Sequence, residues 1–175
     1  MHPHLGPVVG VLIALTWTDV APQQPACSLL TSGDIEAVTG STAREPHKTD
    51  LVISEGPAKG QTLNGCMWAT ADQGMVAVSM MRALEGAARE AGLAKLAEVF
   101  DALKAQHWTE EKQDFANGSC SVMTPPPSQT NVPMLSGCLA EARGMALSVA
   151  FMSPTKKLSI SQTRALLDKA IGHSR

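Results

Sequence analysis

Residues 135–152, with the sequence LSGCLAEARGMALSVAFM, are the stretch that decides the fold. A short turn separates two runs there, and the second run alternates large apolar side chains with small ones. The large side chains are Met145, Leu147, Val149 and Phe151. A period of two residues is typical of a strand with one buried face. The stretch therefore predicts an antiparallel hairpin with one face in the core.

Two more hairpins are expected earlier in the chain. Their strands are residues 66–70 with 75–81, and residues 108–115 with 119–123. The second pair flanks Asn117-Gly118, a strong hairpin signal because both residues tolerate a positive φ. A short edge strand is expected at residues 51–53. Residues 125–133 must form a loop, because consecutive prolines cannot donate hydrogen bonds to a sheet.

Three helices complete the expected fold. Thr31 and Asp34 have the spacing of a capping box and predict a short helix after Thr31. Ser159 and Gln162 repeat that spacing and predict a C-terminal helix. A longer helix is expected over residues 87–105, where apolar residues recur at helical spacing. The pattern predicts an α+β fold, an antiparallel sheet with helices packed on one face.

The four cysteines of the chain predict two disulfides. They are Cys27, Cys66, Cys120 and Cys138. Their number is even, and none of their spacings is the Cys-x-x-Cys of a redox or metal site. Spacing alone leaves three pairings open.

An internal similarity favours one of these pairings. The order Cys-Ser-x-x-Thr, Gly-Cys and a strand beginning Gly-Met occurs over residues 27–78 and again over residues 120–148. If an old duplication explains this order, each copy holds one disulfide, Cys27–Cys66 or Cys120–Cys138. Because chain ends can fray without opening a sheet, Cys27→Ser is expected to lower the melting temperature less than Cys120→Ser.

Residues 1–26 have the features of an export signal with a short linker. The uncharged apolar run at residues 5–17 is too short for a bilayer but has the length of a signal core, although a buried core segment is an alternative interpretation. We therefore expect a periplasmic or extracellular protein with one disulfide-stabilised domain over residues 27–175 and no membrane span in the mature form. Gln24, three positions before Cys27, argues against lipid attachment at that cysteine.

The segments CSLLTSGDIEAVTG (residues 27–40) and GCMW (residues 65–68) resemble a broad group of uncharacterised bacterial secreted proteins and lipoproteins. Members of this group open with Cys-x-Leu-Leu-Thr, continue into a short acidic helix ending at Gly, and later carry Cys followed by an aromatic residue. The resemblance covers residues 27–81. It implies a small extracytoplasmic α+β domain of unknown function, similar to extracellular sensor domains of bacterial kinases, and it transfers no catalytic residue.

Composition and motifs argue against several functions. The chain has 14 basic and 16 acidic residues with no block of like charge, so a nucleic-acid partner is not expected. The motifs GxSxG, HExxH, GxGxxG and the phosphate-binding loop do not occur, so we expect no enzyme, metal or cofactor.

The candidates for a pocket or a functional surface are His107, Trp108 and Trp68. The leading hypothesis is a non-catalytic exported domain that binds a protein or a small ligand at the open face or edge of its sheet. A secreted enzyme inhibitor and an envelope enzyme are the alternatives. Convergence of His107, Trp108 and Asp114 in one deep pocket would favour the enzyme.

Overall fold

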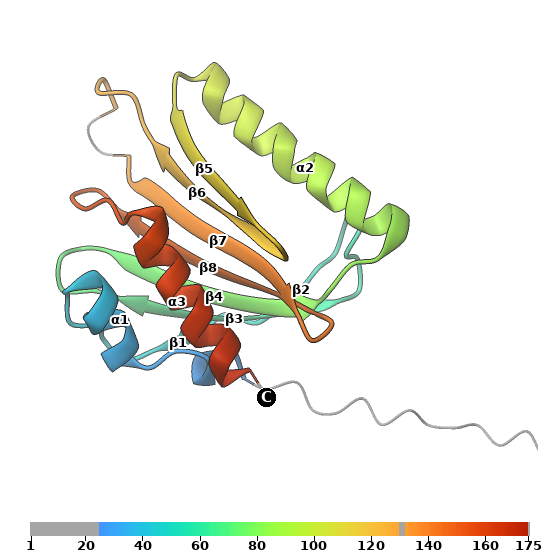
Figure 1. Ribbon diagram of the computed structural model, residues 1–175, viewed down its shortest axis with the longest axis horizontal. Helices are drawn as coiled ribbons and strands as arrows, with labels where there is room; N and C mark the ends of the chain where they lie inside the picture. Colours follow the sequence, from blue (N-terminus) through green and yellow to red (C-terminus); the bar gives the residue numbers. More distant parts are fainter. Residues whose placement is uncertain (1–24, 130–131, 175) are drawn as a thin grey trace, which may run out of the picture.

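The computed structural model describes residues 25–129 and 132–174, which form one sheet and three α-helices (Figure 1). The strands are β1 His47–Lys48, β2 Leu51–Val52, β3 Thr62–Ala69, β4 Met75–Arg82, β5 Thr109–Phe115, β6 Gly118–Thr124, β7 Met134–Ala142 and β8 Met145–Ser153. The helices are the 3-10 turn η1 Ala26–Ser28, α1 Ser32–Thr39, α2 Gly86–Ala105 and α3 Ile160–His173. Residues 1–24 of the expected export signal lie outside the described residues.

The sheet is antiparallel, and its strands follow the order β1-β3-β4-β8-β7-β6-β5, with β2 also paired to β3. The hairpins β3-β4, β5-β6 and β7-β8 all form where the sequence predicts them. The expected edge strand appears as β2, and β1 precedes it on the same neighbour. The predicted α+β fold is confirmed.

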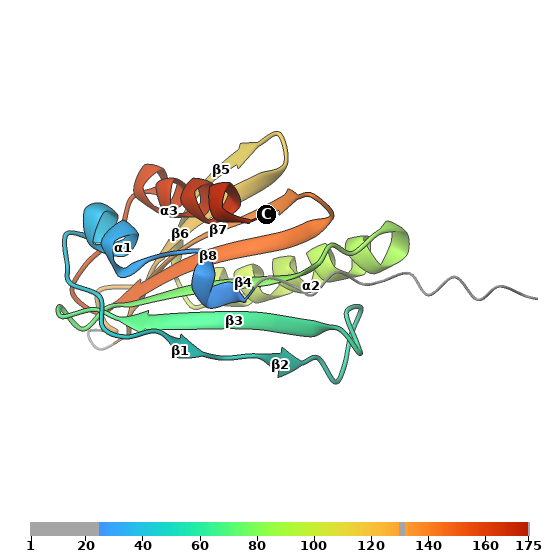
Figure 2. The same ribbon diagram turned by 90° about the horizontal axis from the view of Figure 1, so that it is seen from below.

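One face of the sheet forms the core, with α1 and α3 packed on it (Figure 2). Strand β8 turns Leu147, Val149 and Phe151 to this face, and each is at most 1 % exposed. These are members of the alternating set that predicted the strand. Helix α3 meets them with Leu166 and Leu167, which are fully buried. This face of the sheet is therefore buried by apolar packing against α3.

Helix α2 departs from the expected arrangement, because it lies over the opposite face of the sheet (Figure 2). Its Leu93 and Phe100 share a cavity with Gly137 and Ala150, which alternate along β7 and β8 with core residues and so face away from α3. The physical reason is that α1 and α3 already occupy the first face. The prediction of helices on one face is wrong for α2.

An ion pair joins α1 to α3. Lys169 Nζ lies 2.8 Å from Asp34 Oδ1. Thr31 donates to the other carboxylate oxygen from its backbone N–H and its hydroxyl, which completes the expected capping box. Partial burial raises the pKa of Asp34, but the bonds from Lys169 and Thr31 outweigh it and lower that pKa from 3.8 to about 2. The ionised carboxylate therefore stabilises this helix pair.

We expect Asp34→Asn to destabilise the fold by roughly 1–2 kcal/mol at neutral pH. A depressed pKa in the folded state means that the carboxylate stabilises the protein above about pH 4 and that this contribution disappears as the pH falls towards about 2. Urea unfolding of both proteins across this range measures the difference. The exposed carboxyl variant Glu36→Gln is the matched control on α1. Equal losses in the two variants, or a loss independent of pH, would contradict the assignment.

Both predicted disulfides are present. Cys27 in η1 is bonded to Cys66 in β3, and Cys120 in β6 is bonded to Cys138 in β7. The second bond joins residues that face each other across two strands already connected by backbone hydrogen bonds. The first bond holds η1 against the sheet.

The proposed duplication is supported at the hairpins. Cys66 and Cys138 occupy equivalent places, each in the first strand of a hairpin and each opposite a valine, Val78 or Val149, in the second strand. Both cysteines also face the core. The hairpins β3-β4 and β7-β8 thus correspond in topology.

The other half of the internal similarity has no structural counterpart. Cys27 and Ser28 belong to η1 and Thr31 is the N-cap of α1, whereas residues 120–124 belong to strand β6. The shared Cys-Ser-x-x-Thr pattern therefore adopts two different conformations. The sequence match led to the correct pairing of cysteines, but it does not define two equivalent structural repeats.

The structure also changes the expected order of disulfide contributions. Leu29 and Leu30 beside η1 are at most 1 % exposed, so this end cannot fray without opening the core. In the chain-entropy model, removing the Cys27–Cys66 bond, which joins residues 39 positions apart, should lower the free energy of unfolding by about 4 kcal/mol. Removing the Cys120–Cys138 bond, which joins residues 18 positions apart, should lower it by about 3 kcal/mol.

We therefore expect the double serine variant at Cys27 and Cys66 to have a lower melting temperature than the double serine variant at Cys120 and Cys138. Calorimetry of both proteins measures this order. The reverse order would show that the N-terminal segment can detach from the core.

Candidate functional site

A groove of about 760 Å³ lies between α2 and the sheet face that α3 leaves uncovered. Side chains of α2 form one wall, and strands β5 to β8 form the floor. We call it the α2 groove. Its volume lies within the range of roughly 300–1,000 Å³ that is usual for small-molecule sites.

Three rows of side chains cross the strands and make the floor of the α2 groove. One outer row consists of Met123, Leu135 and Met152. The other outer row consists of Ser119, Leu139 and Ser148. The middle row is Ser121, Gly137 and Ala150. Because the middle residues are small, the floor is hollow along its centre. A Cβ built on Gly137 would meet no atom closer than the Val149 carbonyl oxygen at 3.7 Å.

Helix α2 covers the floor without packing tightly on it. None of its residues is buried, and Leu93 and Leu96 on the groove side remain 52 % and 42 % exposed. Most helices in proteins are stabilised by packing an apolar face rather than by their intrinsic propensity. The apolar side of α2 and the floor thus both keep apolar surface that an inserted molecule could bury.

Ion pairs join α2 to the sheet near both of its ends. Arg89 Nε lies 3.0 Å from Glu141 Oε1, and Lys104 Nζ lies 2.6 Å from Glu110 Oε2. The bond from Lys104 is the main cause that lowers the pKa of Glu110, against the opposing effect of burial. Ser121 donates a further hydrogen bond to Glu110. The carboxylate at the β5 side of the groove therefore stays ionised and paired.

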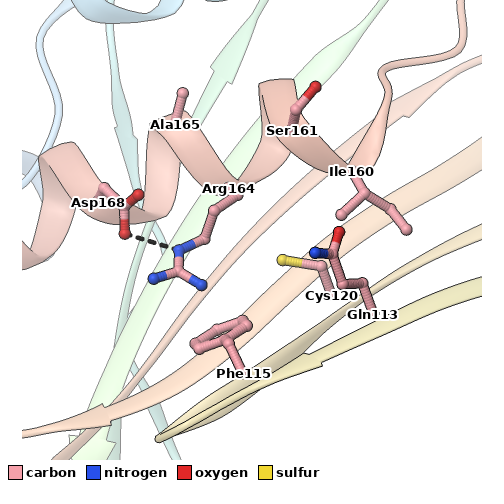
Figure 3. Close-up of a pocket in the computed structure, with 8 residues that line it drawn as sticks. All are labelled: Gln113, Phe115, Cys120, Ile160, Ser161, Arg164, Ala165 and Asp168. Carbon is pink, nitrogen blue, oxygen red and sulfur yellow. Dashed lines mark hydrogen bonds and ion pairs between the residues drawn. The ribbon is translucent and has the colours of Figure 1, made fainter.

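A second cavity, of about 270 Å³, lies on the core side between α3 and strands β5 and β6 (Figure 3). The guanidinium of Arg164 stacks 3.6 Å from the ring centre of Phe115. Its Nε donates to Asp168 at 2.7 Å, so the charge is already compensated. The cavity is smaller than usual ligand sites. We therefore take the α2 groove as the candidate site.

The residues singled out from the sequence do not line the α2 groove. Trp68 is 1 % exposed in the core. Trp108 is 7 % exposed, and its Nε1 has no hydrogen-bond partner among the described residues. His107 is exposed in the turn after α2, with a φ of 65°. Asp114 is exposed and pairs with Lys112, so the convergence that would favour an enzyme is not observed.

Sequence reasoning missed the groove, although it predicted the helix that forms one wall. The apolar residues that predicted this helix include Leu93, Leu96 and Phe100, which line the groove instead of a packed core. The row of small floor residues could not be recognised in the sequence, because its members come from three strands and meet only in the observed register.

Comparison of the chain with protein-family models gives no match, and comparison with curated proteins gives none either. Within residues 25–129 and 132–174, no helix has the length and apolar content needed to cross a membrane. The same residues hold no cluster of three or more potential metal ligands.

We expect the backbone amides of α2 to exchange with solvent at least about tenfold faster than those of α3 in the ligand-free protein. The reason is that α3 buries four residues whereas α2 buries none. Hydrogen-exchange mass spectrometry measures both helices in one sample, so α3 is an internal control. Equal protection would show that α2 is held by contacts stronger than those described.

Proposed function

We propose that this protein is an exported, non-catalytic binding domain that takes an apolar small molecule into the α2 groove. The main support for this proposal is that α2 and the sheet present apolar surfaces to each other, and that both surfaces are partly exposed. The groove between them is large enough for a small molecule. Burial of apolar area is favourable at roughly 25 cal/mol per Å². An apolar molecule that fills the groove would therefore remove apolar area of both α2 and the sheet from water, which favours binding.

A small ligand is favoured over a partner protein. Helix α2 stands above the floor, so a flat protein surface cannot lie against the hollow row of Gly137 and its neighbours. The polar side chains at the groove also engage one another: Ser79 and Ser148 share a hydrogen bond of 2.7 Å, and Ser121 is bonded to Glu110. Such an arrangement supports binding rather than acid-base chemistry.

Export is supported by the two disulfides. Structural disulfides persist in oxidising compartments, such as the periplasm and the extracellular space, and are rare in the cytosol. The apolar run at residues 5–17 supports the same location. A binding domain in such a compartment would meet apolar molecules released from the cell envelope.

The test uses diphenylhexatriene, an uncharged rod-shaped dye whose fluorescence rises in apolar surroundings. We expect the purified protein to bind it and Gly137→Leu to reduce the affinity at least about tenfold. The added side chain would occupy the hollow of the floor, where a Cβ meets only the carbonyl at 3.7 Å, so the fold should be retained. Dye titration and a thermal melt of each variant measure binding and folding separately.

The control is Gly172→Leu, at the end of α3 on the other side of the molecule, where a Cβ meets no atom within 4 Å. It should bind the dye like the wild type. Unchanged binding in Gly137→Leu, or equal losses in both variants, would show that the dye lies elsewhere. No dye binding by the wild type would contradict the proposed function.

A further inference from the structure

We propose that the α2 groove selects an uncharged long-chain molecule, such as a fatty alcohol or neutral ester, over a fatty acid or an alkylamine. This inference rests on the proposed function and names the chemical class of its ligand. It follows from the length of the groove and from the pairing of charges along it.

The length favours a chain. Groove-lining residues of α2 run from Leu93 to Lys104, which at a rise of 1.5 Å per residue spans about 17 Å. Along this span the wall presents Leu96 and Phe100. The three rows of the floor follow one another along the same span, with the hollow middle row between the two outer rows. An extended hydrocarbon chain fits such an elongated apolar space, whereas a compact polar metabolite would leave its polar groups without partners.

The charges of the groove compensate one another. Its lining contains two acidic and two basic side chains, Asp101, Glu110, Lys104 and Lys112. Lys104 is paired with Glu110 at 2.6 Å, and Lys112 with Asp114 at 3.1 Å. Asp101 is close enough to Lys104 to raise its pKa together with Glu110. Each cation therefore already has an anionic neighbour.

An ionic head group would gain little in this setting. A carboxylate placed beside Lys104 would be repelled by Glu110 and Asp101, which lie close to the same ammonium group. An alkylammonium group placed beside Glu110 would be repelled by Lys104, which is already paired with that carboxylate. Removing an ionised group from water without a new partner is costly. A hydroxyl or ester head avoids that cost and can contact the hydroxyl of Ser121, which lies beside Glu110 on the floor.

Competition against bound diphenylhexatriene tests this selectivity. Dodecanol, dodecanoate and dodecylammonium have the same chain and differ in the charge of the head group. Measured below the solubility limit of dodecanol and below the micelle concentrations of the two ions, dodecanol should displace the dye at a concentration at least about tenfold lower than either ion. Equal or tighter binding of an ion would overturn the inference while leaving the proposed function intact. Absence of dye binding by the wild type would overturn both.

A charge variant provides the second readout. Glu110→Gln removes the partner of Lys104 but keeps an oxygen that can accept from Ser121. We expect the affinity for dodecanoate, relative to that for dodecanol, to rise about tenfold in this variant. Glu111→Gln is the control, because Glu111 is the next residue on the same strand, faces the other way and pairs with Lys157. No gain for dodecanoate in Glu110→Gln, or the same gain in the control, would contradict the inference.

Discussion

The alternation of side chains along β7 and β8 is the constraint on which the rest of the structure depends. Because successive residues point to opposite faces, the same strands send Leu147, Val149 and Phe151 into the core and Ser148 and Ala150 to the other side. One face can therefore be sealed by α3 while the other stays open. A shift of register by one residue would exchange the two faces and lose both the core and the groove.

The two faces are covered by helices in different ways. Helix α3 packs fully buried leucines against the core face of the sheet, and the ion pair of Lys169 with Asp34 joins α1 to α3 on the same side. Helix α2 instead stays above the sheet and is joined to it by Arg89 and Lys104 near its ends. The packed core and the candidate site thus lie on opposite faces of the sheet.

The disulfides support this division of roles. Cys66 and Cys138 both point into the core, and each lies on the first strand of a central hairpin. Neither bond reaches α2, which is joined to the sheet by the ion pairs of Arg89 and Lys104. The disulfides therefore cross-link the core and leave α2 without a covalent cross-link to the floor.

The pairing of the cysteines was indicated by an internal similarity between distant parts of the sequence, whereas the hairpins and the capped helices α1 and α3 were determined by residues close together in the chain. These features depend on local signals: the alternation at residues 145–151, the Asn117-Gly118 turn, and the three-residue spacing of Thr31 and Asp34. Only the tertiary structure decided that α2 lies on the face opposite α3, that Trp108 is buried and that a groove exists. These features depend on which residues from distant strands become neighbours, and no local pattern encodes that register.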